Sequence, residues 1–185
     1  MKTSFKEEKD CFILNGTKNW ITNAPIADIF IIWAIDNEKN IQGFVIEKNT
    51  PGLSTSLIEN KASLKISPTG QIILNNVKIP KENILPNTQG WKSVFSCLNN
   101  ARYGIAWGVM GAAQASWLIA KNYTENRIVF KKPLASKQLI QKKLAVMQTE
   151  ITLGWSACLH AGRAMDVGKD IKVAISLLKR NNCQK

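Results

Sequence analysis

The sequence is poor in the residues that build metal sites and disulfide frameworks. It has one histidine, His160, and four widely spaced cysteines without a C-x-x-C pair, namely Cys11, Cys97, Cys158 and Cys183. This spacing argues against a zinc site and provides no disulfide framework. We therefore expect no bound metal and four reduced thiols packed as small hydrophobic side chains. The alternative of a catalytic thiol needs a partner base, and only His160 is available for that role.

Long hydrophobic runs are also missing. No run approaches eighteen uninterrupted apolar residues, and the start from Met1 to Glu8 lacks the apolar stretch of a secretory signal. The sequence thus predicts a soluble, cytoplasmic protein without a membrane span. Its 185 residues are 45% hydrophobic and 8% aromatic, which is ample for one ordinary domain or two small ones.

Acidic residues are scarce relative to basic ones. Twenty-five Lys and Arg against 13 Asp and Glu leave a net charge of +12, which attracts nucleic acid, acidic lipid or a phosphate-bearing cofactor. The basic residues are scattered, and the only local clusters are Lys131-Lys132, Lys142-Lys143 and Lys179-Arg180. None is interleaved with aromatic residues in the manner of a single-strand binding platform. A nucleic-acid hypothesis would rest on net charge alone, and we expect no nucleic-acid partner.

The first half of the chain has the pattern of an antiparallel β domain. From Phe12 to about Leu85, short β-branched or aromatic runs alternate with turn pairs. The pair Asn15-Gly16 predicts a two-residue hairpin turn, because both positions tolerate positive φ. Further strands are predicted at 29–35, 41–47, 54–58, 71–74 and 77–79, with turns at Thr69-Gly70 and Asn75-Asn76.

The second half has helical periodicity. Beyond Ser93 proline is nearly absent and apolar residues recur every three or four positions. We predict helices from Ser93 to Asn126, from Ser136 to about 166–168 after the break at Pro133, and from Asp170 onward. A small-residue face on the first helix is predicted at Ala101, Ile105, Val109, Ala112, Ala113 and Ser116. The fold class is therefore α+β, with a β domain at 1–90 and part of an all-α bundle at 91–185.

One motif in the β half resembles a known family. The segment from Leu14 to Asn23 reads L-N-G-T-K-N-W-I-T-N and resembles the L-x-G-x-K-x-W-I-T-N signature of the acyl-CoA dehydrogenase middle domain. The resemblance implies that Trp20 packs beside the isoalloxazine ring of FAD. It also implies that Thr22, with the chain at Ile21, hydrogen-bonds the flavin near N5. The alternative for Trp20 is a cross-strand tryptophan in a plain core.

A second motif resembles the glutaryl-CoA dehydrogenases in particular. It reads F-S-C-L-N-N-A-R-Y-G-I-A-W-G and begins at Phe95. In that family the start of this helix borders the acyl-CoA pocket, which implies a substrate-binding role for Phe95, Ser96, Cys97, Leu98, Asn99, Asn100, Ala101 and Arg102. Arg102 matches the family's substrate-contacting arginine. The alternative for Arg102 is a structural ion pair at a helix start.

A third motif runs R-I-V-F-K-K-P-L from Arg127 and is followed by Gln138. It resembles the family pattern D-R-x-x-F-G-x-P-L with a later glutamine. The resemblance implies that Arg127 and Gln138 bind the pyrophosphate and adenosine part of FAD, commonly across a subunit interface. Two positions depart from the pattern, with Asn126 in place of aspartate and Lys131 in place of glycine. If the backbone at Lys131 has positive φ, a lysine strains the turn by roughly 1 kcal/mol.

The resemblance covers essentially the whole chain but lacks two family motifs. Neither the flavin-binding T-E-P-x-x-G-S-D segment nor the Y-E-G-T loop with its glutamate base occurs, so we assign no catalytic residue. The carboxylates Glu47, Glu59, Glu82 and Glu125 are interpreted as solvated. Because an incomplete bundle also leaves apolar surface exposed, the chain is expected to be a truncated piece. It would be a natural remnant, a split-gene product or an excerpt, and weak or inactive alone.

For the complete protein, the resemblance implies oxidative decarboxylation of glutaryl-CoA to crotonyl-CoA, a step in lysine and tryptophan degradation. The expected partners are an acyl-CoA substrate and electron-transferring flavoprotein. A homo-oligomer, a tetramer in the family, is expected for the completed enzyme. The alternative is a non-enzymatic remnant, or one subunit of a split enzyme that needs complementary pieces.

Overall fold

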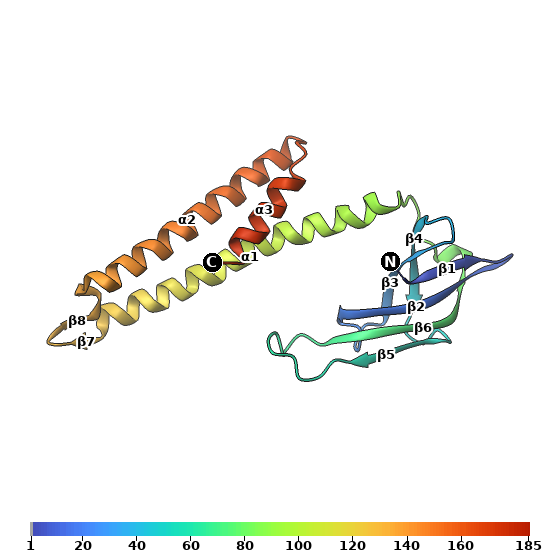
Figure 1. The fold of residues 1–185 in the computed structure, drawn as a ribbon, viewed down its shortest axis with the longest axis horizontal. Helices are drawn as coiled ribbons and strands as arrows, with labels where there is room; N and C mark the ends of the chain where they lie inside the picture. Colours follow the sequence, from blue (N-terminus) through green and yellow to red (C-terminus); the bar gives the residue numbers. More distant parts are fainter. Residues whose placement is uncertain (1) are drawn as a thin grey trace. The chain divides into compact units, whose positions relative to one another are not determined.

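The computed structural model describes residues 2–185, which form six longer strands, a small hairpin and three helices (Figure 1). The elements are β1 (Ser4–Glu7), β2 (Cys11–Thr22), β3 (Ile29–Ile35), β4 (Ile41–Glu47), β5 (Leu53–Leu57), β6 (Thr69–Pro80), η1 (Lys81–Asn83), α1 (Trp91–Asn126), β7 (Ile128–Val129), β8 (Lys132–Pro133), η2 (Leu134–Ser136), α2 (Gln138–Asp166) and α3 (Lys172–Asn182). The chain divides into two compact units, one reaching Val94 and the other running from Phe95 to Lys185. The predicted α+β class is confirmed.

The β unit is one sheet with the strand order β4-β3-β1-β2-β6-β5. All neighbouring strands are antiparallel except β1 and β3, which meet only at the bridge between Ser4 and Ile35. Alternate residues of the strands face one core, which includes Leu14, Phe44 and Ile72. Aromatic edges meet there, because the rings of Phe12 and Phe44 lie 5.2 Å apart in an edge-to-face arrangement. This core holds β2 rigidly, and β2 carries the W-I-T motif.

The predicted hairpin at Asn15-Gly16 is wrong, because β2 runs through both residues without turning. Neither predicted turn pair in β6 is a turn, because β6 is continuous from Thr69 to Pro80. Thr69 and Gly70 pair with Thr22 and Ile21 of β2, and Asn75 and Asn76 form a bulge opposite Asn15. Asn15 donates from Nδ2 to Asn76 Oδ1 at 3.0 Å and accepts from the Asn76 amide at 2.8 Å. Glycine is required at Gly16 for another reason: a Cβ there would lie 2.7 Å from Thr3 Cα.

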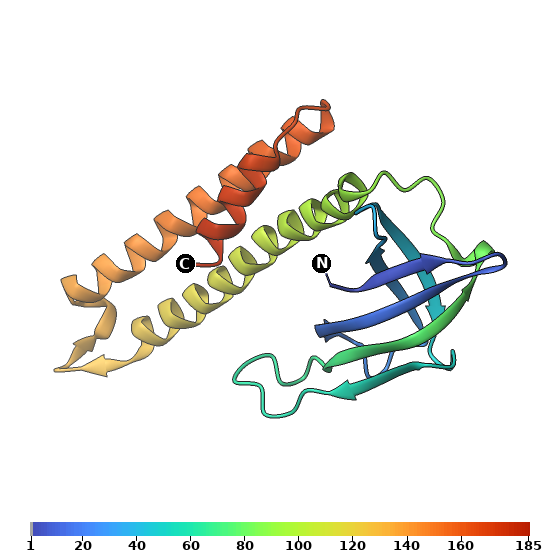
Figure 2. The same cartoon turned by 45° about the vertical axis from the view of Figure 1, so that its right-hand side comes forward.

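The three helices lie close to their predicted positions. In the helical unit α1 and α2 run side by side, and α3 folds back along them (Figure 2). The predicted small-residue face of α1 is wrong in part, since Ile105 and Ala112 are exposed. The buried positions of α1 are instead Ala106, Met110 and Thr124. Ala106 packs with Cys158 and Ala161 of α2 and Leu178 of α3, and Met110 lies against Gly154 of α2. The spacing of apolar residues in the sequence did not distinguish the predicted face of α1 from the buried one.

A buried amide ties the three helices together. Asn182, at the end of α3, is 1% exposed and donates from Nδ2 to the Ala106 carbonyl at 3.0 Å and to Cys158 Sγ at 3.3 Å. Tyr103 adds a second tie, because its hydroxyl donates to the Cys158 carbonyl at 3.0 Å. Burial raises the pKa of the Cys158 thiol, and the hydrogen bond from Asn182 partly opposes that effect. This cysteine is thus an inert packing residue, as expected from the sequence. The same expectation is wrong for Cys97 and Cys183, which are exposed.

Candidate functional site

Trp20 is displayed on the surface of the β unit by an irregularity in β2. Between the pairs Lys18–Ile72 and Ile21–Gly70, two residues of β2 oppose one residue of β6, which is a β-bulge. Trp20 has a φ of 60°, its amide donates to Asn19 Oδ1 at 3.0 Å, and its side chain is 62% exposed. The alternative of a plain core tryptophan is therefore wrong. A left-handed backbone at a large aromatic residue is strained, and such strain concentrates at functional sites.

The W-I-T motif separates its side chains onto two sides. Ile21 packs against the core, whereas Trp20 and Thr22 are exposed. An indole and a hydroxyl are thus presented together, with an aliphatic side chain anchoring the strand between them. This donor set fits the isoalloxazine ring of FAD, since a flat apolar ring needs an aromatic or aliphatic wall and a hydrogen-bond donor near its polar edge.

The segment matched to the acyl-CoA pocket forms the first turns of α1. At about 100° per residue, its eight residues surround the helix, so they do not all face one ligand. Phe95, Asn99 and Arg102 share a face because they lie four and three positions apart. Arg102 donates from Nη1 to Asn99 Oδ1 at 3.1 Å, and within residues 2–185 it takes part in no ion pair. The structural ion-pair interpretation of Arg102 is therefore not supported by the described residues.

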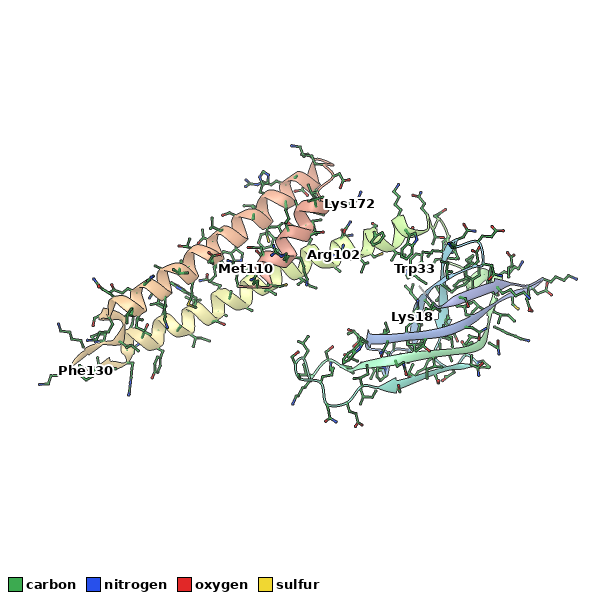
Figure 3. The ribbon with its side chains drawn as sticks, in the orientation of Figure 1. Lys18, Trp33, Arg102, Met110, Phe130 and Lys172 are labelled. Carbon is green, nitrogen blue, oxygen red and sulfur yellow. The ribbon has the colours of Figure 1, made fainter. Side chains whose placement is uncertain are left out.

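The segment matched to the FAD pyrophosphate lies at one end of the helical hairpin (Figure 3). Arg127 follows the last residue of α1, and Gln138 is the first residue of α2. Both are exposed. The intervening β7 and β8 pair Val129 with Lys132, which leaves Phe130 and Lys131 as a two-residue loop. The backbone closes this hairpin at its base, because the Leu134 amide donates to the Arg127 carbonyl at 2.8 Å.

The two loop residues have positive φ, as was considered for Lys131 because it replaces a glycine of the family pattern. Phe130 has a φ of 50° and Lys131 a φ of 64°, and positive φ at both positions is the requirement of a type I′ turn. Asparagine followed by glycine is the preferred pair for such a turn, so both natural residues here are unfavourable. The lysine substitution is therefore accommodated with left-handed strain.

None of the four carboxylates set aside on sequence grounds is enclosed. Glu47, Glu59, Glu82 and Glu125 are all exposed, and Glu125 pairs with Lys121 at 2.8 Å across one helical turn. Groups of three or more metal-ligating side chains do not occur among residues 2–185. Nor does this part of the chain contain a helix with the length and apolarity needed to cross a membrane.

Comparison with known proteins agrees with both units. A family model described as "Acyl-CoA dehydrogenase, middle domain" matches residues 1–77, and one described as "Acyl-CoA dehydrogenase, C-terminal domain" matches residues 88–184. The chain belongs to the acyl-CoA dehydrogenase family. This acyl-CoA dehydrogenase chain is 38% identical over 175 residues to glutaryl-CoA dehydrogenase of Desulfococcus multivorans, covering 91% of the chain and 45% of that relative. It is also 38% identical over 166 residues to the short-chain specific acyl-CoA dehydrogenase of Rattus norvegicus, covering 85% of the chain and 40% of that relative.

Solved structures of the family share this arrangement. A glutaryl-CoA dehydrogenase from Mycobacterium smegmatis in complex with FADH2 aligns with a TM-score of 0.95 and 41% identity, covering 100% of this chain and 47% of that one. The acyl-CoA dehydrogenase chain described here therefore spans about half the length of the relatives that it matches.

One polar group of the β unit was not singled out from the sequence. Lys18, on β2, donates from Nζ to the Trp33 carbonyl of β3 at 2.7 Å, and burial lowers the pKa of this lysine. The lysine stands inside the L-x-G-x-K-x-W-I-T-N motif, which was the only available signal. Its partner lies 15 residues away in another strand, and pattern reasoning does not give such pairings.

Proposed function

We propose that this chain supplies the flavin-facing β unit and the first bundle helices of an FAD-dependent acyl-CoA dehydrogenase of the glutaryl-CoA type. The observation that carries the proposal is the bulge in β2, which holds Trp20 and Thr22 outward while Ile21 is anchored in the core. A strained backbone and an exposed indole together cost stability, and a bound aromatic ring on that indole offsets the cost.

In this proposal each unit supplies residues that bind FAD. Trp20 forms an apolar wall for the isoalloxazine ring and excludes water from it, and Thr22 donates a hydrogen bond to the ring. Arg127 is positioned to bind two phosphate oxygens through its planar guanidinium, and Gln138 to bind the adenosine portion. The exposure of both side chains leaves them accessible to a cofactor, including one held by another subunit.

The substrate role falls to the first turns of α1. Arg102 is already oriented by Asn99, and Phe95 on the same face provides apolar contact for an acyl-CoA. FAD held by Trp20, Thr22, Arg127 and Gln138 would supply the hydride acceptor for the β-carbon of the acyl chain, and a base would remove the α-proton. Since the exposed glutamates named above lack the family motif, we assign the base to none of them. The completed enzyme would convert glutaryl-CoA to crotonyl-CoA and carbon dioxide. It would pass the electrons to electron-transferring flavoprotein.

The glutaryl-CoA assignment is supported by the close match that begins at Phe95 and by the identity to glutaryl-CoA dehydrogenases. A short-chain substrate is the second candidate, because the short-chain specific relative has the same 38% identity. The two are distinguished by mixing purified chain with FAD, a dye acceptor and either glutaryl-CoA or butyryl-CoA. We expect weak or no turnover from the chain alone, and turnover at rates normal for the family would refute the expectation of truncation.

Cofactor binding has a direct test. Flavin fluorescence and equilibrium dialysis measure the dissociation constant for FAD with the parent chain and with Trp20→Asn, which tolerates the positive φ of this position. Loss of one aromatic stacking contact, about 0.5–1.5 kcal/mol, corresponds to roughly 2–13-fold weaker binding. The control is Trp155→Phe, which removes an indole from α2. No FAD binding by the parent, or unchanged affinity in Trp20→Asn, would contradict the proposal.

A further inference from the structure

One lysine of the β unit lies behind the end of β2 that carries the W-I-T motif. Lys61 belongs to the loop 58–68, which joins β5 to β6 and lies where β6 begins and β2 ends (Figure 1). Its Nζ donates to Thr69 Oγ1 at 2.8 Å and to the Ser67 carbonyl at 2.5 Å. Thr69 is the first residue of β6 and pairs with Thr22, the last residue of β2. The ammonium is thus bound to the residue that lies opposite Thr22.

Thr22 and Thr69 share one face of the sheet. Directly opposed residues of an antiparallel pair place their side chains on the same side, with Cβ atoms about 4.5–5.5 Å apart. Thr69 is 7% exposed beneath its contacts with the loop, whereas Thr22 is exposed. The cross-strand spacing and the hydrogen bond to Thr69 together place the Lys61 ammonium within about 10 Å of the Thr22 side chain.

The loop 58–68 is tied to both strands, which holds the ammonium in place. The Asn23 amide, directly after Thr22, donates to the Pro68 carbonyl at 2.7 Å. On the other side of the loop, the Ile58 amide donates to the Thr69 carbonyl at 2.8 Å. The Thr69 hydroxyl that accepts from the lysine donates in turn to the Ser67 carbonyl at 3.1 Å. The lysine and Thr22 therefore keep their relative positions.

The charge of Lys61 is not neutralised by a carboxylate. Within residues 2–185 this partly buried lysine takes part in no ion pair, and both of its acceptors are neutral oxygens. The nearby charged residues Glu59 and Lys65 of the loop and Asp28 of the turn before β3 are all exposed, so water and salt weaken their fields. A neutral donor would suffice to close the loop, and a full positive charge exceeds that requirement.

We propose that Lys61 is a positioning residue for hydride transfer, which acts through Thr69 and Thr22 and favours negative charge on a ring bound at Trp20 and Thr22. This role rests on the flavin function proposed above. A hydride carries two electrons and one proton from the β-carbon, so the ring that receives it gains one negative charge. A fixed cation nearby stabilises that charge, and more strongly where water is excluded.

The first test needs no flavin. Thr22→Cys places a thiol where the hydroxyl stands, and its alkylation rate against pH gives the acid dissociation constant of that thiol. Mass spectrometry reads the rate on the peptide that contains position 22, apart from the native cysteines. A cation within about 10 Å near a protein surface should raise this constant about three- to tenfold.

Three second substitutions in the Thr22→Cys chain separate charge from loop closure. Lys61→Gln keeps a hydrogen-bond donor and loses the charge, so it should lower the constant of the thiol about three- to tenfold. Lys61→Arg keeps the charge and should restore the constant. Lys65→Gln removes the same charge from an exposed position of the same loop and should change the constant less than about twofold.

The second test uses the otherwise unmodified chain saturated with FAD. Titration with dithionite beside a reference dye gives the equilibrium constant for reduction of the bound flavin from its absorbance. Lys61→Gln should lower this constant about three- to tenfold, which is about 14–30 mV for a two-electron couple. Lys61→Arg should restore the constant, and Lys65→Gln should leave it unchanged. A lysine that only closes the loop would alter the melting temperature and neither constant.

The outcomes distinguish this role from the flavin function itself. Circular dichroism checks that each variant folds; if Lys61→Gln does not, the thiol constant of Thr22→Cys is read against salt, and it should fall about twofold or more between 0.05 M and 0.5 M. An unchanged thiol constant, equal changes in Lys61→Gln and Lys65→Gln, or an unchanged flavin constant would overturn the role of Lys61. Absence of FAD binding by the parent chain would instead refute the flavin function, while the thiol result still decides whether Lys61 directs its charge at Thr22.

Discussion

Replacing Lys131 with glycine is expected to stabilise the helical unit. Lys131 has a φ of 64° in the two-residue loop between β7 and β8, where a side chain with Cβ is disfavoured. Left-handed backbone costs about 1–2 kcal/mol per residue, and glycine removes that cost. Glycine also loses about 0.5–1 kcal/mol through the greater freedom of the unfolded chain. The net gain is therefore about 0.5–1 kcal/mol in the free energy of unfolding.

The assay is urea unfolding of the full chain followed by helical circular dichroism, with thermal unfolding as a second measurement. A gain of about 0.5–1 kcal/mol should raise the melting temperature by roughly 1–4 °C for a chain of this length. The matched control is Lys132→Gly, which removes the same charge from the neighbouring β8 residue and should be neutral or destabilising. Because Phe130 also has positive φ, Phe130→Asn combined with Lys131→Gly should add to the gain. If Lys131→Gly is no more stable than Lys132→Gly, the assignment of strain to this position is wrong.

Two further substitutions test the packing of the helices. Gly154→Ala places a Cβ against the Met110 sulfur and should cost about 1–3 kcal/mol of unfolding free energy. Gly108→Ala, where nothing lies within 4 Å, should instead stabilise by about 0.5–1 kcal/mol, so equal effects in urea unfolding would contradict the packing of α1 on α2. Asn182→Ala should cost about 1–3 kcal/mol, because it removes the buried amide that bonds Ala106 and Cys158. The control is Asn100→Ala, at an exposed position of α1, and equal destabilisation in that variant would show that burial is not the cause.

The helices could be predicted from the sequence because their evidence is local. Recurrence of apolar residues every three or four positions, with Pro133 between two such segments, marked α1 and α2 to within a few residues. The buried stripe of α1 could not be chosen, because both stripes contain small apolar residues. Which stripe of α1 is buried depends on where Gly154 and Asn182 contact that helix. These residues lie 44 and 72 positions beyond Met110 in the sequence.

The strands were predictable, but their turns were not. Asn15-Gly16 has the composition of a hairpin turn, yet the glycine is needed because the backbone of Thr3 lies close to it. Asn15 hydrogen-bonds to Asn76, 61 residues away, in the bulge of β6. The strand β1 was missed because it is short and mostly polar. The motif with Trp20 identified candidate ligands of a flavin from resemblance, whereas the bulge that exposes the indole is a property of pairing with β6.

The burial of Cys158 makes its rate of chemical labelling a measure of how often the helical unit opens. Two other cysteines, Cys97 and Cys183, are exposed, so an alkylating reagent reaches them in the native state. The Cys158 thiol is enclosed by α1 and α3, and it becomes reactive only when these helices separate. The slow phase of labelling at Cys158 therefore reports how often the three helices come apart. Variants that loosen the tie at Asn182 should shorten that phase and leave the fast phase unchanged.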